Sequence, residues 1–294
     1  MNDNFNPTKQ DLFLLNWLLL IFILVVAMII IGGITRITDS GLSMVEWRPF
    51  LGFLPPLNNQ EWERVFDLYK NTPEYSFYNK GMLLSEFKFI FFWEYFHRLW
   101  GRIIGIVFII PFIYFVFTKK IDKFITTRLL VILFFGSLQA FIGWWMVKSG
   151  LIDKPDVSQY RLAIHFGNSL LILFLLFWLI LDLKYKKSRI KFDLNLIIFF
   201  IIFVTIIAGS LVAGMDAGLM YNTYPLMNDS FFPSDYLSLG LLDPFENPGS
   251  AQFHHRHLGF ISLVAIGIFF VKNFYQKKVF LYLVFLIVLI VTQF

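Results

Sequence analysis

Long apolar runs, separated by shorter polar segments, alternate along the whole chain. Seven of them approach or exceed the roughly 20 residues needed to cross a hydrocarbon core of about 30 Å. They lie at about 12–33, 89–117, 128–147, 161–181, 194–214, 252–271 and 279–294. Because backbone polar groups inside a bilayer must bond within their own segment, each run is predicted to be a helix. The pattern predicts an all-α, polytopic membrane protein with seven spans present.

Composition supports this class and narrows the chemistry. Of the 294 residues, 57% are hydrophobic and only 15% are charged, which is too little charge to cover the surface of a soluble domain. The absence of cysteine excludes disulfides, cysteine-ligated zinc and a thiol nucleophile. The net charge of +5 does not indicate a nucleic-acid partner, because the basic residues cluster in short segments between apolar runs.

The distribution of lysine and arginine predicts how the spans are oriented. Basic clusters occur at 119–128, 184–191 and 272–278, whereas the loop at 215–250 has five acidic residues and no Lys or Arg. The positive-inside rule therefore places the N-terminus in the cytoplasm and the two long loops, 34–87 and 215–250, outside. We expect a multi-pass protein of the cell inner membrane with periplasmic loops.

All five histidines lie where a predicted span begins on the outer side. His97 lies early in the second run, His165 early in the fourth, and His254, His255 and His257 early in the sixth. The histidines are therefore expected in the outer leaflet, toward the periplasmic side, on three different helices. Ionisable residues in a membrane are rare and usually functional.

An internal repeat relates the two halves of the chain. The segment "EYFHRLWGR" (94–102) resembles "QFHHRHLGF" (252–260), which aligns His97 with His255 and Arg98 with Arg256 at an offset of 158. "SLQAF" (137–141) likewise resembles "VTQF" (291–294). An even number of spans per half makes such repeats parallel. We expect two parallel four-helix-bundle units, 1–185 and 186–294.

The second copy of the repeat lacks the last span that a full duplication predicts. A full duplication would add an eighth span, with a counterpart of His165 at about position 320. The sequence ends at residue 294, so we interpret it as truncated within its seventh span, with the eighth missing.

Two facing histidines in one bundle predict haem ligation. His97 and His165 lie at similar depth on the second and fourth spans, and two neutral imidazoles without thiolates or clustered carboxylates suit the two axial positions of haem iron. Zinc would require three or four ligands. In the second unit the repeat selects His255, whereas His254 and His257 are expected on other, interfacial faces.

Four arginines lie near the outer boundary of these spans. Their guanidinium groups could bind haem propionates in a bidentate manner, or they could simply extend toward the aqueous interface. The sequence leaves both interpretations open for Arg98, Arg102, Arg161 and Arg256.

Glu94 is the strongest candidate for chemistry beyond ligation. It lies three residues before His97, one helical turn toward the outer side on the same face. A carboxylate there could handle protons or stabilise positive charge on a reacting carbon, or it could only pair with a neighbouring arginine. At the position that we match to Glu94, the second repeat has Ala251. We therefore expect chemistry in the first unit and a redox cofactor in the second.

The first long loop contains a predicted amphipathic helix. In "NNQEWERVFDLYK", Trp62, Phe66 and Tyr69 recur at helical spacing after a candidate asparagine cap. We expect this helix to lie over the outer end of the first unit.

Several longer stretches resemble the haem A synthase family, in its cysteine-free class of alphaproteobacteria and mitochondria. They include "GGITRITDSGLSMVEWRPFLGFLPPL", "EYFHRLWGR", "QAFIGWWMVKSGL", "VSQYRLAIHF", "AGSLVAGMDAGLMYNTYPLM" and "QFHHR", in family order. The resemblance implies an eight-span, two-unit oxidoreductase. Its reaction is oxidation of the C8 methyl group of haem O to a formyl group, by two hydroxylations and loss of water from the gem-diol. The product is haem A for cytochrome oxidase.

The resemblance also implies roles for individual residues. His97 and His165 would ligate the iron of the substrate haem O, and Glu94 would be the acidic catalytic residue. The second unit would hold haem b through His255 and a histidine of the eighth span. Haem O synthase is the implied partner that supplies the substrate, membrane lipid surrounds the spans, and the oligomeric state, including a homo-oligomer, stays open.

Two other classes of protein fit parts of the pattern. A di-haem membrane cytochrome that only transfers electrons would need the histidines but not Glu94. A transporter would need broken helices and a polar site at the midplane, where this sequence is almost purely apolar.

Overall fold

The computed structural model describes residues 9–47, 52–152, 155–185 and 192–273. Within these ranges, six helices are long and apolar enough to cross a membrane. They are Asp11–Ile37, Leu84–Phe117, Lys123–Gly150, Gln159–Tyr185, Leu194–Gly214 and Pro248–Lys272. The prediction of an all-α, polytopic membrane protein is confirmed. The seventh predicted span, 279–294, lies outside the described residues.

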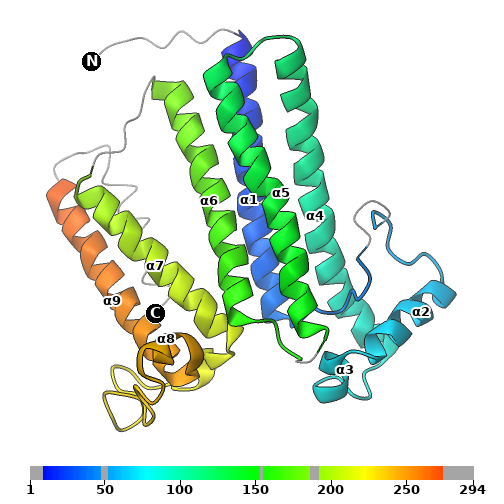
Figure 1. Ribbon diagram of the computed structural model, residues 1–294, viewed down its shortest axis with the longest axis vertical. Helices are drawn as coiled ribbons and strands as arrows, with labels where there is room; N and C mark the ends of the chain where they lie inside the picture. Colours follow the sequence, from blue (N-terminus) through cyan, green and yellow to red (C-terminus); the bar gives the residue numbers. More distant parts are fainter. Residues whose placement is uncertain (1–8, 48–51, 153–154, 186–191, 274–294) are drawn as a thin grey trace. The chain divides into compact units, whose positions relative to one another are not determined.

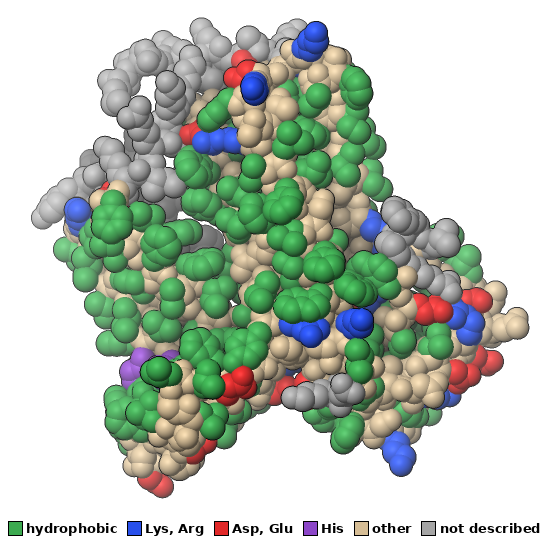
Figure 2. Space-filling model, viewed as in Figure 1, with side chains coloured by type: hydrophobic (Ala, Val, Ile, Leu, Met, Phe, Trp, Pro, Cys, Tyr) green, Lys and Arg blue, Asp and Glu red, His purple; other side chains and the backbone are tan. Residues whose placement is uncertain are grey.

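Hydrophobic side chains cover the flanks of the long helices (Figure 2), as expected of surfaces that face lipid. Phe89, Phe92, Ile110 and Phe134 are among the large apolar side chains that the fold leaves exposed there. Charged side chains gather mainly toward the ends of the helices and over the first long loop (Figure 2).

The chain divides into two compact units, Met1–Ser188 and Arg189–Phe294. Four long helices of unit 1 form a bundle (Figure 1): α1 (Lys9–Ile37), α4 (Leu84–Phe117), α5 (Lys123–Gly150) and α6 (Gln159–Tyr185). Around it, α1 packs on α4, α4 on α5, α5 on α6, and α6 on α1. The helices α4 and α6 therefore lie on a diagonal, and both begin at the same end of the bundle.

Side-chain packing in unit 1 is densest at the end of the bundle far from the beginning of α4 and α6. A cluster of buried side chains joins all four helices there, including Leu18 and Ile21 of α1, Phe115 of α4, Leu129 of α5 and Leu176 of α6. Lipid tails are as apolar as these side chains, so close van der Waals packing, and not the expulsion of water, holds the helices together at this end.

A proline inside α4 shows how this packed end satisfies its backbone. Pro111 has no N–H, so the carbonyl of Val107 loses its usual helical donor. The indole nitrogen of Trp17 on α1 donates to that carbonyl at 2.8 Å. The two helices are thereby joined by a hydrogen bond in a region without water.

The first long loop folds over the other end of unit 1. It contains α2 (Asn59–Lys70) and α3 (Pro73–Phe77). Asn58 caps α2 by accepting from the backbone N–H of Glu61 at 2.8 Å. The buried face of α2 stacks Phe66 on Phe87 of α4, with ring centroids 4.8 Å apart. The predicted amphipathic helix is confirmed.

Unit 2 is described as an antiparallel pair of long helices, α7 (Leu194–Gly214) and α9 (Pro248–Asn273). The loop between them contains the short helices η1 (Ala217–Leu219), η2 (Gly240–Leu242) and α8 (Asp243–Glu246). Asp243 organises this loop by accepting from the backbone of Leu237 and Leu239 and from the hydroxyl of Ser250. Burial alone would raise the pKa of Asp243, but these hydrogen bonds lower it to about 2.

The same turn follows the first long helix of each unit. "GGITRITDSGL" (32–42) and "GSLVAGMDAGL" (209–219) align at an offset of 177. Within them Asp39 and Asp216 both adopt positive φ, at 47° and 51°, a left-handed conformation that aspartate tolerates better than most residues. Each turn sends the following loop back across the end of its own unit.

Candidate active site

His97 and His165 lie on the diagonal helices of unit 1. Both are in the first half of their helices, α4 and α6, at the end of the bundle covered by the first long loop. The largest packed cluster of the unit lies at the opposite end.

Three histidine rings rest against glycines of a neighbouring helix. In each case a Cβ added to the glycine would meet the imidazole Cε1 atom at 3.1 Å or less. The pairs are Gly32 with His97 (3.1 Å), Gly143 with His165 (3.0 Å) and Gly209 with His255 (2.8 Å). These are the same three histidines that the internal repeat and the span positions select from the five.

The ring nitrogens of His97 and His255 differ in their partners. His255 Nδ1 lies 3.1 Å from the carbonyl oxygen of Thr205 on α7. A carbonyl only accepts, so Nδ1 carries the proton and Nε2 keeps a lone pair for a metal ion. His97 Nδ1 is buried and has no hydrogen-bond partner among the described residues. Both rings fit haem ligation, but only His255 is oriented by a backbone hydrogen bond.

His165 is contacted by a polar pair inside the bundle. The amide nitrogen of Gln139 on α5 lies 3.2 and 3.3 Å from the two ring nitrogens and donates to the His165 carbonyl at 3.1 Å. Asn168 in turn donates to the Gln139 side-chain oxygen at 2.6 Å. Sequence reasoning missed Asn168, although an amide within the apolar run 161–181 is a usable signal.

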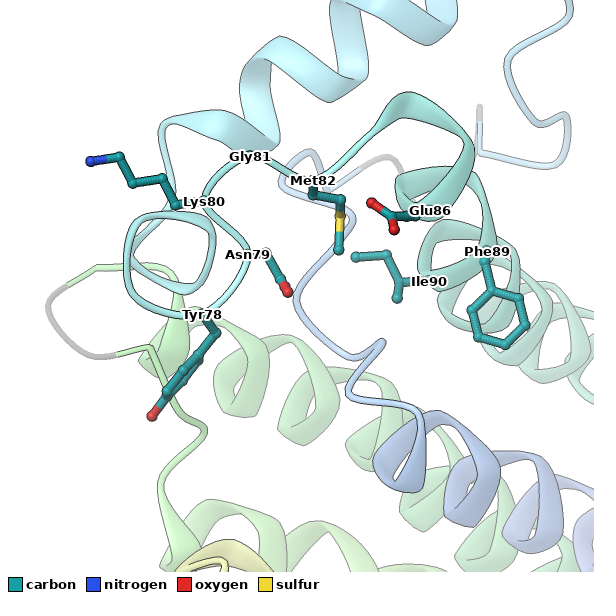
Figure 3. Close-up of a pocket in the computed structure, with 8 residues that line it drawn as sticks. All are labelled: Tyr78, Asn79, Lys80, Gly81, Met82, Glu86, Phe89 and Ile90. Atoms are coloured by element: carbon teal, nitrogen blue, oxygen red, sulfur yellow. The ribbon is translucent and has the colours of Figure 1, made fainter.

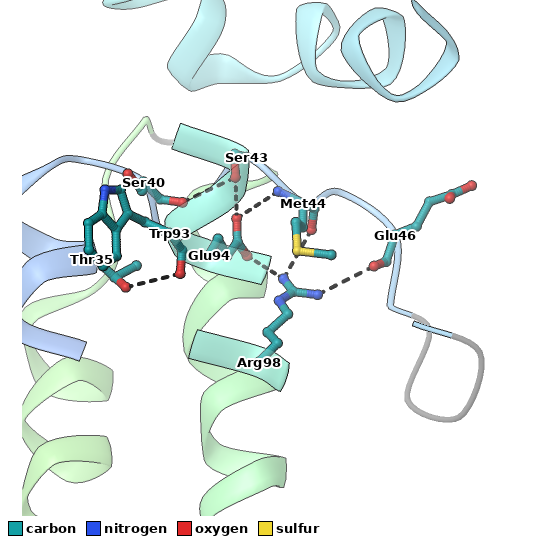
Figure 4. Close-up of polar contacts among 8 residues, drawn as sticks. All are labelled: Thr35, Ser40, Ser43, Met44, Glu46, Trp93, Glu94 and Arg98. Carbon is teal, nitrogen blue, oxygen red and sulfur yellow. Dashed lines mark hydrogen bonds and ion pairs between the residues drawn. The ribbon is translucent and has the colours of Figure 1, made fainter. Parts of the chain in front are cut away.

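Glu94 is 3% exposed and is held by three donors (Figure 4). It accepts from the Ser43 hydroxyl at 2.7 Å and from the Met44 backbone N–H at 2.7 Å, and it forms an ion pair with Arg98. Pairing with a neighbouring arginine, one of the two sequence interpretations, therefore occurs. Ser43 and Met44 belong to the loop after α1, so this network also fixes the loop to α4.

The arginine of each unit makes the same pair of backbone contacts. Arg98 donates to the carbonyls of Met44, at 3.1 Å, and Glu46, at 3.4 Å. In unit 2 the equivalent carbonyls belong to Tyr221 and Thr223, by the offset of 177, and Arg256 donates to both. We call this shared arrangement of arginine and loop carbonyls the loop latch.

The counterpart of Glu94 in unit 2 is Gln252, and the match to Ala251 is wrong by one residue. Gln252 lies three positions before His255, as Glu94 lies three before His97. Its side-chain oxygen accepts from the Tyr221 backbone N–H at 3.1 Å, the same bond that Glu94 makes with Met44. Ala251 instead packs against Val212 and Ala217 in a small apolar cluster.

The remaining candidate arginines and histidines contact other groups. Arg161 donates to the Trp145 carbonyl at 2.7 Å and lies over its ring. The Arg102 guanidinium lies over the ring of Phe53, 5.4 Å from its centre. In unit 2 the rings of His254 and His257 contact aromatic rings that include Tyr236 and Phe231 of the second loop.

Two hollows lie on the loop-covered end of unit 1. An open one of about 520 Å³ is lined by residues 78–82 and by Glu86, Phe89 and Ile90 of α4 (Figure 3), and none of these is a candidate residue. A second, of about 280 Å³, is lined by Ser43, Met44, Arg98 and Arg102 together with α2 and the preceding loop. The second hollow therefore borders the groups that hold Glu94.

A further buried carboxyl group lies in this loop. Glu74 of α3 is 6% exposed, and its Oε2 has no hydrogen-bond partner within the described part of the chain. Burial raises the pKa of Glu74 to about 8, against a hydrogen bond from Tyr69 that lowers it. Three carboxylates raise it further, those of Glu94, Asp39 and Asp156. Glu74 is therefore largely protonated at neutral pH.

Comparison with known proteins gives consistent relatives. The family described as "Cytochrome oxidase assembly protein" matches residues 15–294. A protein of Nitrosospira multiformis named "Heme A synthase" is 44% identical over 270 residues, which cover 87% of this chain and 75% of that protein. Two others with this name are 46% identical over 265 residues, in the Wolbachia of Culex pipiens (87% and 80% covered), and 44% identical over 283 residues, in Pelagibacter ubique (94% and 84%). No solved structure matches the chain.

Proposed function

The chain belongs to the cytochrome oxidase assembly protein family, and from that premise we propose that it acts as a haem A synthase. It is an oxidoreductase that converts haem O to haem A by oxidising the C8 methyl group to a formyl group. The observation that carries this proposal is in unit 1, where two diagonal helices each contain a histidine and one of them also contains a buried carboxylate. Glu94 is one helical turn from His97 and is fixed by three donors.

We propose that haem O binds in unit 1 with His97 and His165 as axial ligands. These rings belong to two parallel helices that lie on a diagonal of the bundle. The close approach to Gly32 and Gly143 places each ring against a neighbouring helix backbone, where a larger residue would collide. The unpaired Nδ1 of His97 is a polar atom that the bundle itself leaves unsatisfied within the described residues.

Haem b is the proposed cofactor of unit 2, and Nε2 of His255 would hold its iron. The Nδ1 hydrogen bond to Thr205 and the contact with Gly209 support this assignment, because both orient the ring. When bound, haem b supplies one-electron transfer for the oxidation in unit 1.

Glu94 acts as a fixed anion beside the reacting methyl group. The Ser43 hydroxyl, the Met44 N–H and Arg98 hold the carboxylate in place before the reaction begins, so little reorganisation is needed. A negative charge there stabilises positive charge that develops on the carbon, and its oxygens can accept a proton from the attacking water.

Arginines near the loop latch are proposed to hold the haem propionates. Arg98 and Arg102 line the same hollow of about 280 Å³, and a planar guanidinium suits a carboxylate. Arg161 and Arg256 are the corresponding candidates on α6 and α9. Because Arg98 and Arg256 already donate to two carbonyls each, propionate binding has to use their remaining N–H groups.

The distribution of charge in the sequence supports a proposal for the membrane and the orientation of the protein. We propose that it lies in the cell inner membrane with a cytoplasmic N-terminus and with the histidines toward the periplasmic side. Its partners are membrane lipid and haem O synthase, which supplies the substrate.

Replacing Glu94 with Gln tests the proposed enzyme against an electron-transferring di-haem cytochrome. A cytochrome of this kind would need no acid at this position, since the amide of Gln252 makes the same loop bond in unit 2. An enzyme should lose haem A formation and accumulate haem O or a hydroxylated intermediate, measured by mass analysis of extracted haems. A haem composition unchanged by Glu94→Gln would favour the cytochrome.

A further inference from the structure

Among the described glycines of the long helices, three touch a histidine ring, whereas Gly150 touches the side chain of Leu42. For Gly143 and Gly209, the three nearest atoms to an added Cβ all belong to one imidazole. For Gly32 the only atoms within 4 Å are Cε1 and Nδ1 of His97, among the described residues. By contrast, an added Cβ at Gly33 or Gly136 would meet nothing within 4 Å in the described structure.

These contacts differ from ordinary helix packing in membranes. Small residues usually allow two helix backbones to approach each other. Here the approaching group is the Cε1 edge of a histidine ring, and it comes within 3.1 Å of where a Cβ would stand. Real Cβ atoms rarely have neighbours this close, so an alanine would require the ring to shift by a few tenths of an ångström.

The internal repeat supports a specific need for glycine at these positions. Gly32 aligns with Gly209 at the offset of 177, and their partners His97 and His255 align at the offset of 158. The adjacent residue, Gly33, aligns with Ser210, so glycine is not required there. Gly lowers helix stability relative to Ala, so a retained glycine in a helix interior needs a reason.

We propose that Gly32, Gly143 and Gly209 are positioning residues that set the orientation of the three haem-ligating imidazoles. Each glycine allows the Cε1 edge of one ring to approach the backbone of a neighbouring helix, which fixes the direction of its metal-binding nitrogen. This inference rests on the proposed ligation of haem by His97, His165 and His255. Gln139, one helical turn before Gly143, adds a hydrogen-bonding contact to the ring of His165.

Alanine substitutions with matched controls test the proposal on the full chain. Gly32→Ala is compared with Gly33→Ala, and Gly143→Ala with Gly136→Ala on the same helix. Purified haem O is titrated into the detergent-solubilised protein, and optical and electron paramagnetic resonance spectra report the axial ligands. We expect at least a tenfold loss of haem O affinity, or a changed low-spin signal, in Gly32→Ala and Gly143→Ala. The controls should stay within about twofold of the unsubstituted protein.

A double-substitution cycle gives a readout that needs no haem. Gly143→Ala should lower the melting temperature of the haem-free protein, because the added methyl group collides with the ring. In a His165→Ala background the collision is absent, so the same substitution should leave the melting temperature unchanged or raise it. An equal fall in both backgrounds, or unchanged haem binding in both glycine variants, overturns the proposal.

The proposed haem ligation and the proposed role of the glycines are tested by different results. If His97→Ala and His165→Ala both keep the haem O spectrum, the proposed ligation is wrong, whatever the melting temperatures show. If those variants lose the spectrum while Gly32→Ala and Gly143→Ala keep it, the ligation stands and the positioning role of the glycines is wrong.

Discussion

Units 1 and 2 share the loop latch but differ in the charge of the side chain that accepts the neighbouring loop N–H. In both, an arginine binds two loop carbonyls, and a side chain three residues before the candidate ligand accepts from the loop N–H. In unit 1 that side chain is the carboxylate of Glu94, whereas in unit 2 it is the neutral amide of Gln252. The shared contacts therefore serve the fold, and the carboxylate is the addition that fits chemistry.

The candidate haem ligands of the two units also differ in the hydrogen bonding of Nδ1. His255 is oriented by a hydrogen bond from Nδ1 to a backbone carbonyl, as expected for the ligand of a resident cofactor. His97 has no such partner among the described residues, which suits a ligand that must release one haem and accept another. Ser43, which donates to Glu94, aligns with Met220, so unit 2 also lacks this hydroxyl.

Removing the arginine should affect the two units unequally. Arg98→Leu leaves Glu94 as a buried carboxylate without its ion-pair partner, which should cost about 3–5 kcal/mol of stability. Arg256→Leu removes hydrogen bonds to neutral acceptors, two carbonyls and the Met227 sulfur, and should cost about 1–3 kcal/mol. Thermal unfolding of both variants in the same detergent measures the difference. Equal losses would mean that the charge of Glu94 is not stabilised by Arg98.

Exchanging the acid and the amide separates fold from chemistry. Glu94→Gln should keep the melting temperature within a few degrees, because in unit 2 the amide of Gln252 accepts the equivalent loop N–H. It should lower haem A formation roughly 100-fold, since a fixed charge at the reacting carbon is lost. Gln252→Glu should lower haem A formation less than this, although it loses the hydrogen bonds from Gln252 Nε2 to the carbonyls of Gly218 and Tyr221. A large loss in Gln252→Glu together with none in Glu94→Gln would reverse the roles assigned to the two units.

The two loops bury carboxyl groups with opposite pH dependence. The folded pKa of Glu74, about 8, is above its ordinary value, so its contribution to stability is present in acid and is lost as pH rises from about 4.5 to 8. That loss is up to about 4 kcal/mol. Asp243, with a folded pKa of about 2, stabilises unit 2 above pH 4 and loses that effect as pH falls toward 2.

Glu74→Gln checks this pH dependence in unit 1. The variant should melt at a higher temperature than the unsubstituted protein at pH 8, with the gap closing toward pH 5. The melting temperatures of both proteins are measured across that range. Glu63→Gln, which changes an exposed carboxylate, is the control. A gap that is constant with pH would show that Glu74 does not titrate there.

The smallest expected effect concerns the hydroxyl that unit 2 lacks. Ser43→Ala removes one hydrogen bond to a charged group and should cost about 1.5–3 kcal/mol in the unfolding free energy or in the barrier to haem A formation. Steady-state haem A levels and thermal unfolding distinguish the two effects. Met220→Ser in unit 2 is the matched change and should alter haem A formation little.

The sequence predicts the spans and the positions of the candidate residues because both depend on local patterns. Hydropathy places His97, His165 and His255 near one end of their helices, and helical spacing places Glu94 beside His97. The glycine contacts and the burial of Glu74 depend on how helices and loops pack, which no local pattern encodes. Gln252 could have been recognised from its spacing to His255, but the hydrogen bond to Tyr221 made the correspondence visible.

The most direct test of the account is near-infrared magnetic circular dichroism of haem O bound to the detergent-solubilised protein, a method that identifies axial ligands. The account predicts a bis-histidine spectrum that is lost in His97→Ala and in His165→Ala but retained in Glu94→Gln. A bis-histidine spectrum that survives both histidine substitutions would contradict it.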